Sequence, residues 1–136
     1  MKNAFIFLFV LLTDQITKYI AVINLNWMAN TGISFGVFPR FPLWILFDLT
    51  FLMFYLMILY KIKFDLKWSL LLAGMGGNLI DRVRFGYVID WIPLPFPIIV
   101  RLYLNIADIA LIIGFICFIF NALYQFENKR KERKFL

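Results

Sequence analysis

The sequence predicts an all-α membrane protein with four transmembrane helices and small extended, β-like elements on the extracytoplasmic side. Hydrophobic residues make up 63% of the 136-residue chain and charged residues only 16%, whereas a soluble domain is about 45–50% apolar and about 25% charged. The mean hydropathy is +0.84. A soluble fold of this length cannot bury so much apolar surface, so we expect one membrane-embedded domain over residues 1–136.

Four apolar runs supply the predicted transmembrane helices. A spanning helix needs about 20 apolar residues, and three of the runs are long enough. The third is short, so we expect Lys67 and Arg82 at its ends to reach toward the two interfaces. The predicted helices cover residues 4–23, 42–60, 66–82 and 104–126, and a basic tail follows at residues 127–136.

The distribution of basic residues predicts the orientation. Nine of the 14 Lys and Arg residues lie in the N-terminus, in the connection between the second and third helices, and in the tail. The opposite side carries Arg40, Arg84 and Arg101. Since cytoplasmic segments carry the excess of Lys and Arg, we expect both termini in the cytoplasm. The net charge of +6 is then a topology signal that also suits anionic lipid headgroups, and it implies no nucleic-acid partner.

Two extracytoplasmic segments are predicted to be extended. Residues 30–36 interleave turn residues with apolar ones, and Gly32 permits a tight backbone there. Residues 87–92 are β-branched and aromatic. The prolines of residues 93–97 exclude a helix, so this stretch should lie as an apolar lip on the membrane surface.

The residue types that are absent restrict the chemistry. The chain has no histidine, one cysteine (Cys117) and two serines (Ser34 and Ser69). Catalytic triads that use histidine, zinc sites of His and Cys, and an intrachain disulfide are therefore excluded. We expect no metal and no cofactor, and any catalysis must use carboxylates, amides, Lys, Arg or the backbone.

Several polar residues within the apolar runs are candidates for a site. A charge at the bilayer centre costs about 2.5–3.5 kcal/mol, so it usually has a partner or a function. Asp14 and Lys18 are four residues apart on one helix and can pair, either as a buried brace or in contact with substrate. Asn78 and Arg82 share a face of the third helix. They belong either to a packing helix with an Asp81–Arg82 ion pair or to a surface that binds a peptide backbone.

Asp90 and Asp108 are the candidates for acid–base chemistry. Asn105 and Asp108 are three residues apart at the start of the fourth helix, and Asp90 lies in the preceding loop. In the predicted topology both aspartates fall near the extracytoplasmic interface. Two neighbouring carboxyl groups do not both ionise easily, so one can activate water while the other protonates a leaving amine. Spacing alone leaves open whether the two side chains meet.

Five sequence blocks, taken in order, resemble the lipoprotein signal peptidase (signal peptidase II) family. Each block alone is weak, but five in this order on the expected helices are specific and cover nearly the whole chain. The blocks are Asp14-Gln15-Ile16-Thr17-Lys18, Asn30-x-Gly32-x-x-Phe35-Gly36, Gly77-Asn78-Leu79-Ile80-Asp81-Arg82, Gly86-Tyr87-Val88-x-Asp90-Trp91 and Asn105-x-Ala107-Asp108. The connection from the first block to the second is shorter than is usual in the family.

The resemblance implies an aspartic endopeptidase of the bacterial cytoplasmic (inner) membrane whose active site opens near the extracytoplasmic face. It would remove the signal peptide of prolipoproteins just before a cysteine that carries a diacylglyceryl group, and globomycin-type peptides would inhibit it. A monomer is expected. The residues implied are the catalytic pair Asp90 and Asp108, the substrate-binding set Asn30, Gly32, Asn78, Arg82 and Asn105, and the supporting set Asp14, Lys18 and Asp81.

Two alternatives remain open from the residues themselves. Ser34 and Lys18 are able to form a Ser-Lys protease dyad, a type that exists. A non-enzymatic membrane protein, such as a small transporter or a complex subunit, would use the same buried charges as a proton path or as packing groups.

Overall fold

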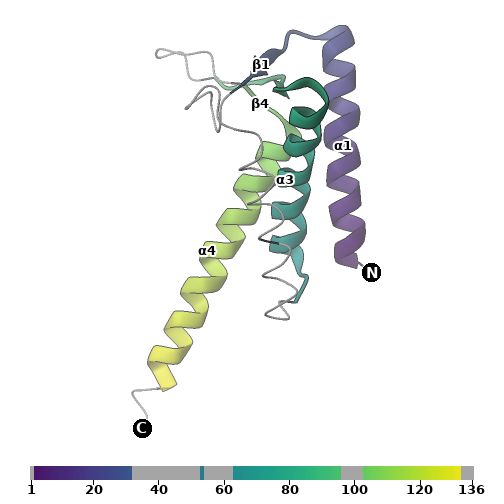
Figure 1. Cartoon of the computed structure of the whole chain (residues 1–136). Coiled ribbons are helices and arrows are strands. Elements are labelled where there is room, and N and C mark those ends of the chain that lie inside the picture. The colour runs from purple at the N-terminus through teal and green to yellow at the C-terminus, as the bar shows by residue number, and fades with distance from the viewer. Residues whose placement is uncertain (1, 32–52, 54–62, 96–102, 133–136) are drawn as a thin grey trace.

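The computed structural model describes residues 2–31, 53, 63–95 and 103–132 (Figure 1). Within these residues, α3 lies between α1 and α4, and the strands gather at one end of the helices. The helices are α1 (Lys2–Asn24), α3 (Leu66–Phe85) and α4 (Ile106–Glu132). The strands are β1 (Met28–Asn30), β2 (Val88–Asp90), β3 (Ile92–Pro93) and β4 (Tyr103–Leu104).

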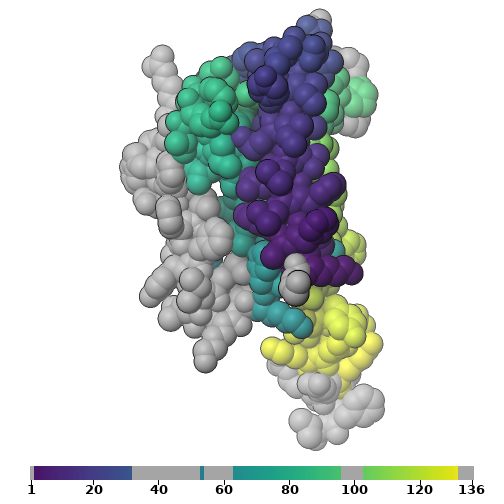
Figure 2. Space-filling view, turned by 90° about the vertical axis from the view of Figure 1, so that its right-hand side faces the viewer, coloured from purple at the N-terminus to yellow at the C-terminus, as the bar shows by residue number. Residues whose placement is uncertain are grey.

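Of the helices that the structure describes, α1 and α4 are long and apolar enough to cross a membrane. Their mean hydropathies are 1.8 and 2.4, yet only 17% of either apolar stretch is buried. Figure 2 shows α1 running along the outside of the molecule, with Phe9 and Leu12 more than half exposed. A core helix of a soluble protein would bury this surface, so these faces are suited to lipid. Apart from residue 53, which is helical, the predicted helix over residues 42–60 lies outside the described residues, and α3 is helical but less apolar.

Local sequence determines where α3 begins and where it ends. Asp65 is the N-cap, and its carboxylate accepts a hydrogen bond from the backbone N–H of Trp68 at 3.4 Å. At the other end Gly86 has φ of +80° and its N–H donates to the carbonyl of Arg82 at 3.0 Å. This left-handed conformation suits glycine. The helix therefore continues three residues past the predicted end, to Phe85, and then turns sharply into β2.

The start of α4 differs from the prediction of residue 104. Tyr103 and Leu104 instead form β4, which pairs antiparallel with β3. Asn105 is therefore the N-cap residue of α4. Its Oδ1 accepts from the N–H of Asp108 at 2.8 Å, and Asp108 Oδ2 accepts from the N–H of Asn105 at 3.2 Å. This reciprocal pair is a capping box. At the other end α4 continues to Glu132, so the first part of the predicted basic tail is helical.

The strands form two small antiparallel pairs. Strand β2 and Ile92 of β3 lie in the segment 87–92 that was predicted to be extended, whereas most of the predicted segment 30–36 lies outside the described residues. Strand β1 pairs with β2, with Met28 opposite Asp90 and Asn30 opposite Val88. All three residues of β2 are buried. The backbone N–H of Trp91 donates to the carbonyl of Leu104 at 2.9 Å, which joins the two pairs. Asp90 is therefore held on a buried strand rather than on a free loop.

Glycines let the three helices approach closely. A Cβ atom at Gly77 would lie 2.6 Å from Asp14 Oδ2 of α1 and 3.1 Å from the Cβ of Ala107 of α4. A Cβ at Gly74 would lie 2.5 Å from the carbonyl oxygen of Ala107. Gly74 and Gly77 thus lie against the neighbouring helices, and Gly77 lets Asp14 lie beside α3.

Gly77→Ala is expected to destabilise the protein by about 1–3 kcal/mol, because the added methyl group has no room beside Asp14 and Ala107. Thermal unfolding in detergent measures the effect. Gly76→Ala is the matched control, since among the described residues its Cβ would meet only Leu11 at 3.6 Å, an ordinary contact, and alanine favours a helix. Equal unfolding temperatures for the two variants would contradict the close-packing account.

Candidate functional site

A buried ion triad lies at the centre of the described helices. Lys18 Nζ is 2.8 Å from Asp14 Oδ2 and 2.9 Å from Asp81 Oδ2. None of the three side chains is more than 2% exposed. The predicted pairing of Asp14 with Lys18 is therefore present. Asp81, for which an ion pair with Arg82 was considered from the sequence, also pairs with Lys18.

The carboxylates of the triad also hold backbone groups of other elements. Asp14 Oδ1 accepts from the N–H of Ala107 at 2.8 Å, in the first turn of α4. Asp81 Oδ2 accepts from the N–H of Ile89 at 3.2 Å, in β2. The triad thus connects α1, α3, α4 and β2. A structural brace would make such contacts, and this is the role that the resemblance implied for the three residues.

Gln15 is a member of this cluster to which sequence reasoning gave no role. Its Nε2 donates to Asp14 Oδ2 at 3.2 Å, to Asp81 Oδ1 at 3.0 Å and to the carbonyl of Gly77 at 3.2 Å. The only signal in the sequence was an amide next to Asp14 within an apolar run. Its partner Asp81 is 66 positions away in the chain, so no local pattern predicts the contact.

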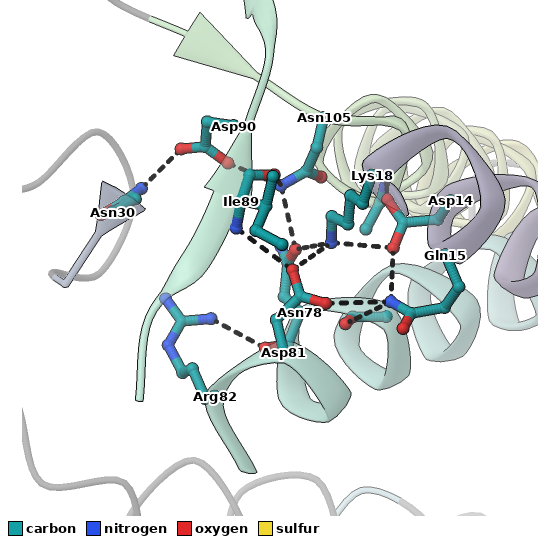
Figure 3. A network of polar contacts seen from close by, with 12 residues as sticks. Asp14, Gln15, Lys18, Asn30, Asn78, Asp81, Arg82, Ile89, Asp90 and Asn105 are labelled. Atoms are coloured by element: carbon teal, nitrogen blue, oxygen red, sulfur yellow. Dashed lines mark hydrogen bonds and ion pairs between the residues drawn. The ribbon is translucent and has the colours of Figure 1, made fainter. Parts of the chain in front are cut away.

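Asp90 is 3% exposed and is held by two side-chain amides (Figure 3). Asn30 Nδ2 donates to Asp90 Oδ2 at 2.9 Å, and Asn105 Nδ2 donates to Asp90 Oδ1 at 2.7 Å. The first amide comes from β1 and the second from the cap of α4. Both oxygens of Asp90 are therefore fixed by donors from outside its own strand.

Asp108 is held by the neighbouring helix and by its own cap. Asn78 Nδ2 of α3 donates to Asp108 Oδ1 at 2.7 Å, while Oδ2 accepts from the N–H of Asn105 at 3.2 Å. Asp108 is only half-buried, in contrast to Asp90. It lies in the first turn of a helix, where the exposed backbone N–H groups favour negative charge.

One hydrogen-bonded network contains both aspartates. Asn105 Nδ2 donates to Asp90 Oδ1 at 2.7 Å and to Asn78 Oδ1 at 3.1 Å, and Asn78 in turn donates to Asp108. Lys18 Nζ donates to the same Asn78 Oδ1 at 3.1 Å, which links the network to the ion triad. Figure 3 shows this convergence of residues from α1, α3, β1, β2 and the start of α4. We call Asn30, Asn78, Asp90, Asn105 and Asp108 the carboxyl–amide cluster.

Arg82 lies at the edge of this cluster. One guanidinium nitrogen donates to the carbonyl of Asn78 at 3.3 Å. The guanidinium is also close enough to Asp108, Asp90 and Asp81 for their charges to interact. Four of the five predicted substrate-binding residues therefore lie together with the two aspartates. The fifth, Gly32, lies outside the described residues.

Burial raises the pKa of Asp90 to about 6, because the ionised carboxylate loses hydration. The hydrogen bonds from Asn30 and Asn105 and the charge of Lys18 lower this pKa, whereas the charge of Asp108 raises it. Asp90 can therefore carry a proton in weakly acidic to neutral conditions, where an ordinary aspartate cannot.

The cluster has the groups needed for proton transfer without a metal. A carboxyl pair that shares one proton offers a general base and a general acid at the same site. Partly exposed amides and a guanidinium can hold a peptide backbone beside it. Among the residues that the structure describes, no three His, Cys, Asp or Glu side chains are grouped so as to hold a metal ion.

Comparisons with known proteins agree with these features. The family model described as "Signal peptidase (SPase) II" matches residues 6–124. The lipoprotein signal peptidase of Thermodesulfovibrio yellowstonii is 32% identical, over 90% of this chain and 95% of that protein. The lipoprotein signal peptidase of Halothermothrix orenii is also 32% identical, over 79% of this chain and 85% of that protein.

Solved structures are similar as well. A bacterial membrane enzyme solved by the in meso method at 2.3 Å resolution superimposes with a TM-score of 0.81 at 29% identity, covering 94% of this chain and 91% of that one. A second, solved at 1.9 Å, has a TM-score of 0.74 at 29% identity, with coverage of 90% and 92%. The family model matches most of the length of this chain, and the chain therefore belongs to the signal peptidase II family.

Proposed function

We propose that this chain is a membrane aspartic endopeptidase that removes signal peptides from diacylglyceryl-modified prolipoproteins, cutting on the N-terminal side of the lipidated cysteine. The observation that carries the proposal is the network in which Asp90 and Asp108 are linked through Asn105 and Asn78. Membership of the family supplies the substrate class, and the network supplies the groups that hydrolysis needs.

Hydrolysis would use the aspartates as a coupled pair. The ionised carboxylate takes a proton from water as the oxygen attacks the scissile carbonyl carbon. The protonated carboxyl then gives its proton to the leaving nitrogen as the C–N bond breaks, which leaves one proton on the pair. Asp90 is suited to the protonated state because burial raises its pKa, and the negative charge of Asp108 raises that pKa further.

The amides and Arg82 would position the substrate. Asn78, Arg82 and Asp108 are partly exposed, so their outer sides are available to a peptide. Holding the scissile bond beside the aspartates lowers the entropic part of the barrier. Asn30 and Asn105 already orient Asp90, and Gly32 would complete the backbone contacts in the following segment.

The substrate would enter laterally, with its acyl chains still in the bilayer. The exposed apolar faces of α1 and α4 suit a chain in the bacterial cytoplasmic (inner) membrane. In Figure 1 the N-terminal end of α1 and the C-terminal end of α4 lie away from the strands. This arrangement supports cytoplasmic termini with the carboxyl–amide cluster near the extracytoplasmic face. We further propose four spans, a monomeric enzyme and inhibition by globomycin-type peptides.

The test is cleavage of a synthetic signal peptide bearing a diacylglyceryl-cysteine, with the unlipidated peptide as control. We expect the purified enzyme to cut only the lipidated peptide efficiently, just before the cysteine. Ser34→Ala should leave this rate unchanged, whereas a Ser-Lys protease would lose it. Ion flux in liposomes without any peptide cleavage would favour the non-enzymatic alternative and would end the proposal.

The pH dependence of cleavage is expected to be bell-shaped in kcat/KM, with the alkaline loss centred near pH 6. Above that pH the pair holds no proton for the leaving nitrogen, and at low pH both carboxyls are protonated and none accepts a proton. The two apparent values belong to the coupled pair. Initial rates at low substrate concentration between roughly pH 4 and pH 9 measure the profile. A rate that rises steadily toward alkaline pH would contradict it.

A further inference from the structure

Lys18 makes one hydrogen bond to a residue outside the ion triad. Its ammonium pairs with Asp14 and Asp81 at 2.8 and 2.9 Å, and it also donates to Asn78 Oδ1 at 3.1 Å. Lys18 is 2% exposed, so almost none of its surface is open to a substrate. This third contact reaches a residue that itself touches Asp108.

The contact determines which way the amide of Asn78 faces. An ammonium group has only donors, so the atom beside it must be the amide oxygen. The –NH₂ group then faces Asp108 Oδ1 and donates to it at 2.7 Å. The flipped amide would place –NH₂ against the ammonium of Lys18 and the amide oxygen against the carboxylate of Asp108. Both contacts would be repulsive, so Lys18 selects one orientation.

The amide of Asn105 is fixed by the same kind of argument. Its Oδ1 accepts from the backbone N–H of Asp108 at 2.8 Å, and a backbone N–H can only donate. Its –NH₂ group therefore faces Asp90 Oδ1 at 2.7 Å and the oxygen of Asn78 at 3.1 Å. The orientation of Asn78 that Lys18 imposes also provides the acceptor for this second donor. Both aspartates thus receive N–H donors from oriented amides.

We propose that Lys18 is a positioning residue for peptide cleavage, which acts through Asn78 by directing its N–H at Asp108 Oδ1. The inference rests on the proposed function. Its consequence is that Asp108 Oδ1 stays an acceptor, so the proton that the pair carries is kept away from the Asn78 side of the cluster. Without Lys18 the Asn78 amide is held only by the Asn105 –NH₂ group and by Asp108. It then flips more readily and can accept from a protonated Asp108, which would lock the pair in an inactive arrangement.

The test must separate this role from that of Lys18 in the ion triad. Lys18→Met alone would leave two buried carboxylates unpaired, which is strongly destabilising. The double variant Asp14→Asn/Lys18→Met removes one negative and one positive charge, so the net charge of the triad is unchanged. Asp14→Asn alone is the matched control: the asparagine oxygen can still accept from Ala107, and the Lys18–Asn78 contact remains. The asparagine –NH₂ group then lies beside the Lys18 ammonium in place of Oδ2, which costs stability, so kcat is compared per folded enzyme.

The expected result is a loss in kcat, measured per folded enzyme on the lipidated peptide. Asp14→Asn should stay within about threefold of wild type, while the double variant should lose about 100-fold, as a misplaced catalytic group does. KM should change by less than about threefold, because Lys18 does not touch the substrate. In an Asn78→Ala background the further loss caused by Lys18→Met should shrink to less than about threefold, since the residue through which Lys18 acts is gone.

The pH profile gives a second readout when it is compared with and without Asn78. Loss of the Lys18 charge alone favours the protonated form of the pair, so the acidic limb of the double variant should shift to higher pH than in Asp14→Asn in either background. Loss of the Asn78 donor adds to this shift, so the shift should be larger with Asn78 than in Asn78→Ala. The charged groups that face Asp108 or Lys18 from every packed element stay the same in both variants apart from Lys18. They are Asp14 or its replacement on α1, Asp81 and Arg82 on α3, and Asp90 on β2.

A conservative variant tests rescue and covers a failure to fold. Asp14→Asn/Lys18→Gln retains a side-chain N–H that can donate to Asn78, so it should recover at least about tenfold of the kcat lost with Met. If Asp14→Asn/Lys18→Met yields no folded enzyme, Asp14→Asn/Lys18→Gln replaces it, both with Asn78 and with Asn78→Ala. The expected loss of kcat is then about tenfold with Asn78 and absent with Asn78→Ala.

Each outcome decides the inference. An unchanged kcat and pH profile in the double variant, or equal losses with and without Asn78, would overturn it and leave Lys18 as a brace. A wild-type enzyme that cuts no lipidated peptide would instead refute the proposed function, whatever the Lys18 variants do.

Discussion

Asp90→Asn and Asp108→Asn are each expected to lower kcat for the lipidated peptide by about a thousandfold or more. Loss of either carboxyl removes the general acid or the general base, which typically contributes about 10²–10⁴ in rate, and the pair acts as a unit. Asparagine has nearly the same shape as aspartate, so the strands and the capping box should remain. Single-turnover cleavage of the lipidated peptide measures the loss.

A distant acid provides the control for this result. Glu127→Gln removes a carboxylate that is 66% exposed and paired with Lys131 on the last part of α4, and it should leave cleavage unchanged. Thermal unfolding of all three variants verifies that they are folded. Near-full activity in either aspartate variant would show that the pair is not the catalytic centre, even if the wild-type enzyme cuts the peptide.

Asn105→Ala and Asn105→Ser are both expected to lower kcat by about 100-fold or more. Asn105 donates to Asp90 and to Asn78, and neither alanine nor the short serine side chain can reproduce those contacts. Asp90 would then lose one of the two amides that orient it. A displacement of about 1 Å near the chemistry can cost about 10²-fold in rate.

Stability should separate the two Asn105 variants. Asparagine caps α4 by accepting from the N–H of Asp108, and serine can also cap a helix, whereas alanine cannot. Asn105→Ala should therefore lose about 0.5–2 kcal/mol of stability, and Asn105→Ser much less. Denaturation in detergent measures the difference. If serine retained full activity, the cap alone would explain Asn105, and its link between the aspartates would have no catalytic importance.

Local patterns in the sequence predicted much of the site's composition. The absence of histidine and the single cysteine left carboxylates and amides as the available groups. The i,i+4 spacing of Asp14 and Lys18 predicted their pairing, because residues four apart lie on one face of a helix. Asn105 and Asp108 were predicted to share a face for the same reason, and they form the capping box.

Helix ends were less well predicted, because tertiary contacts decide them. The apolar run of the fourth helix starts at residue 104, yet pairing with β3 holds Tyr103 and Leu104 as a strand. The third helix ends only where Gly86 can adopt a left-handed conformation. Hydrophobicity alone does not distinguish a helical residue from a strand residue when both are buried.

By itself, the sequence determined that the chain belongs in a membrane and that its chemistry cannot use histidine. Both follow from composition, which does not depend on how the chain folds. The tertiary structure decided which residues meet: Asp81 pairs with Lys18, Gln15 links α1 to α3, and Asn105 joins Asp90 to the network of Asp108. Apart from the capping contact between Asn105 and Asp108, these contacts join positions far apart in the chain. Their distances are determined by helix packing at Gly74 and Gly77 and by strand pairing, which no local spacing encodes.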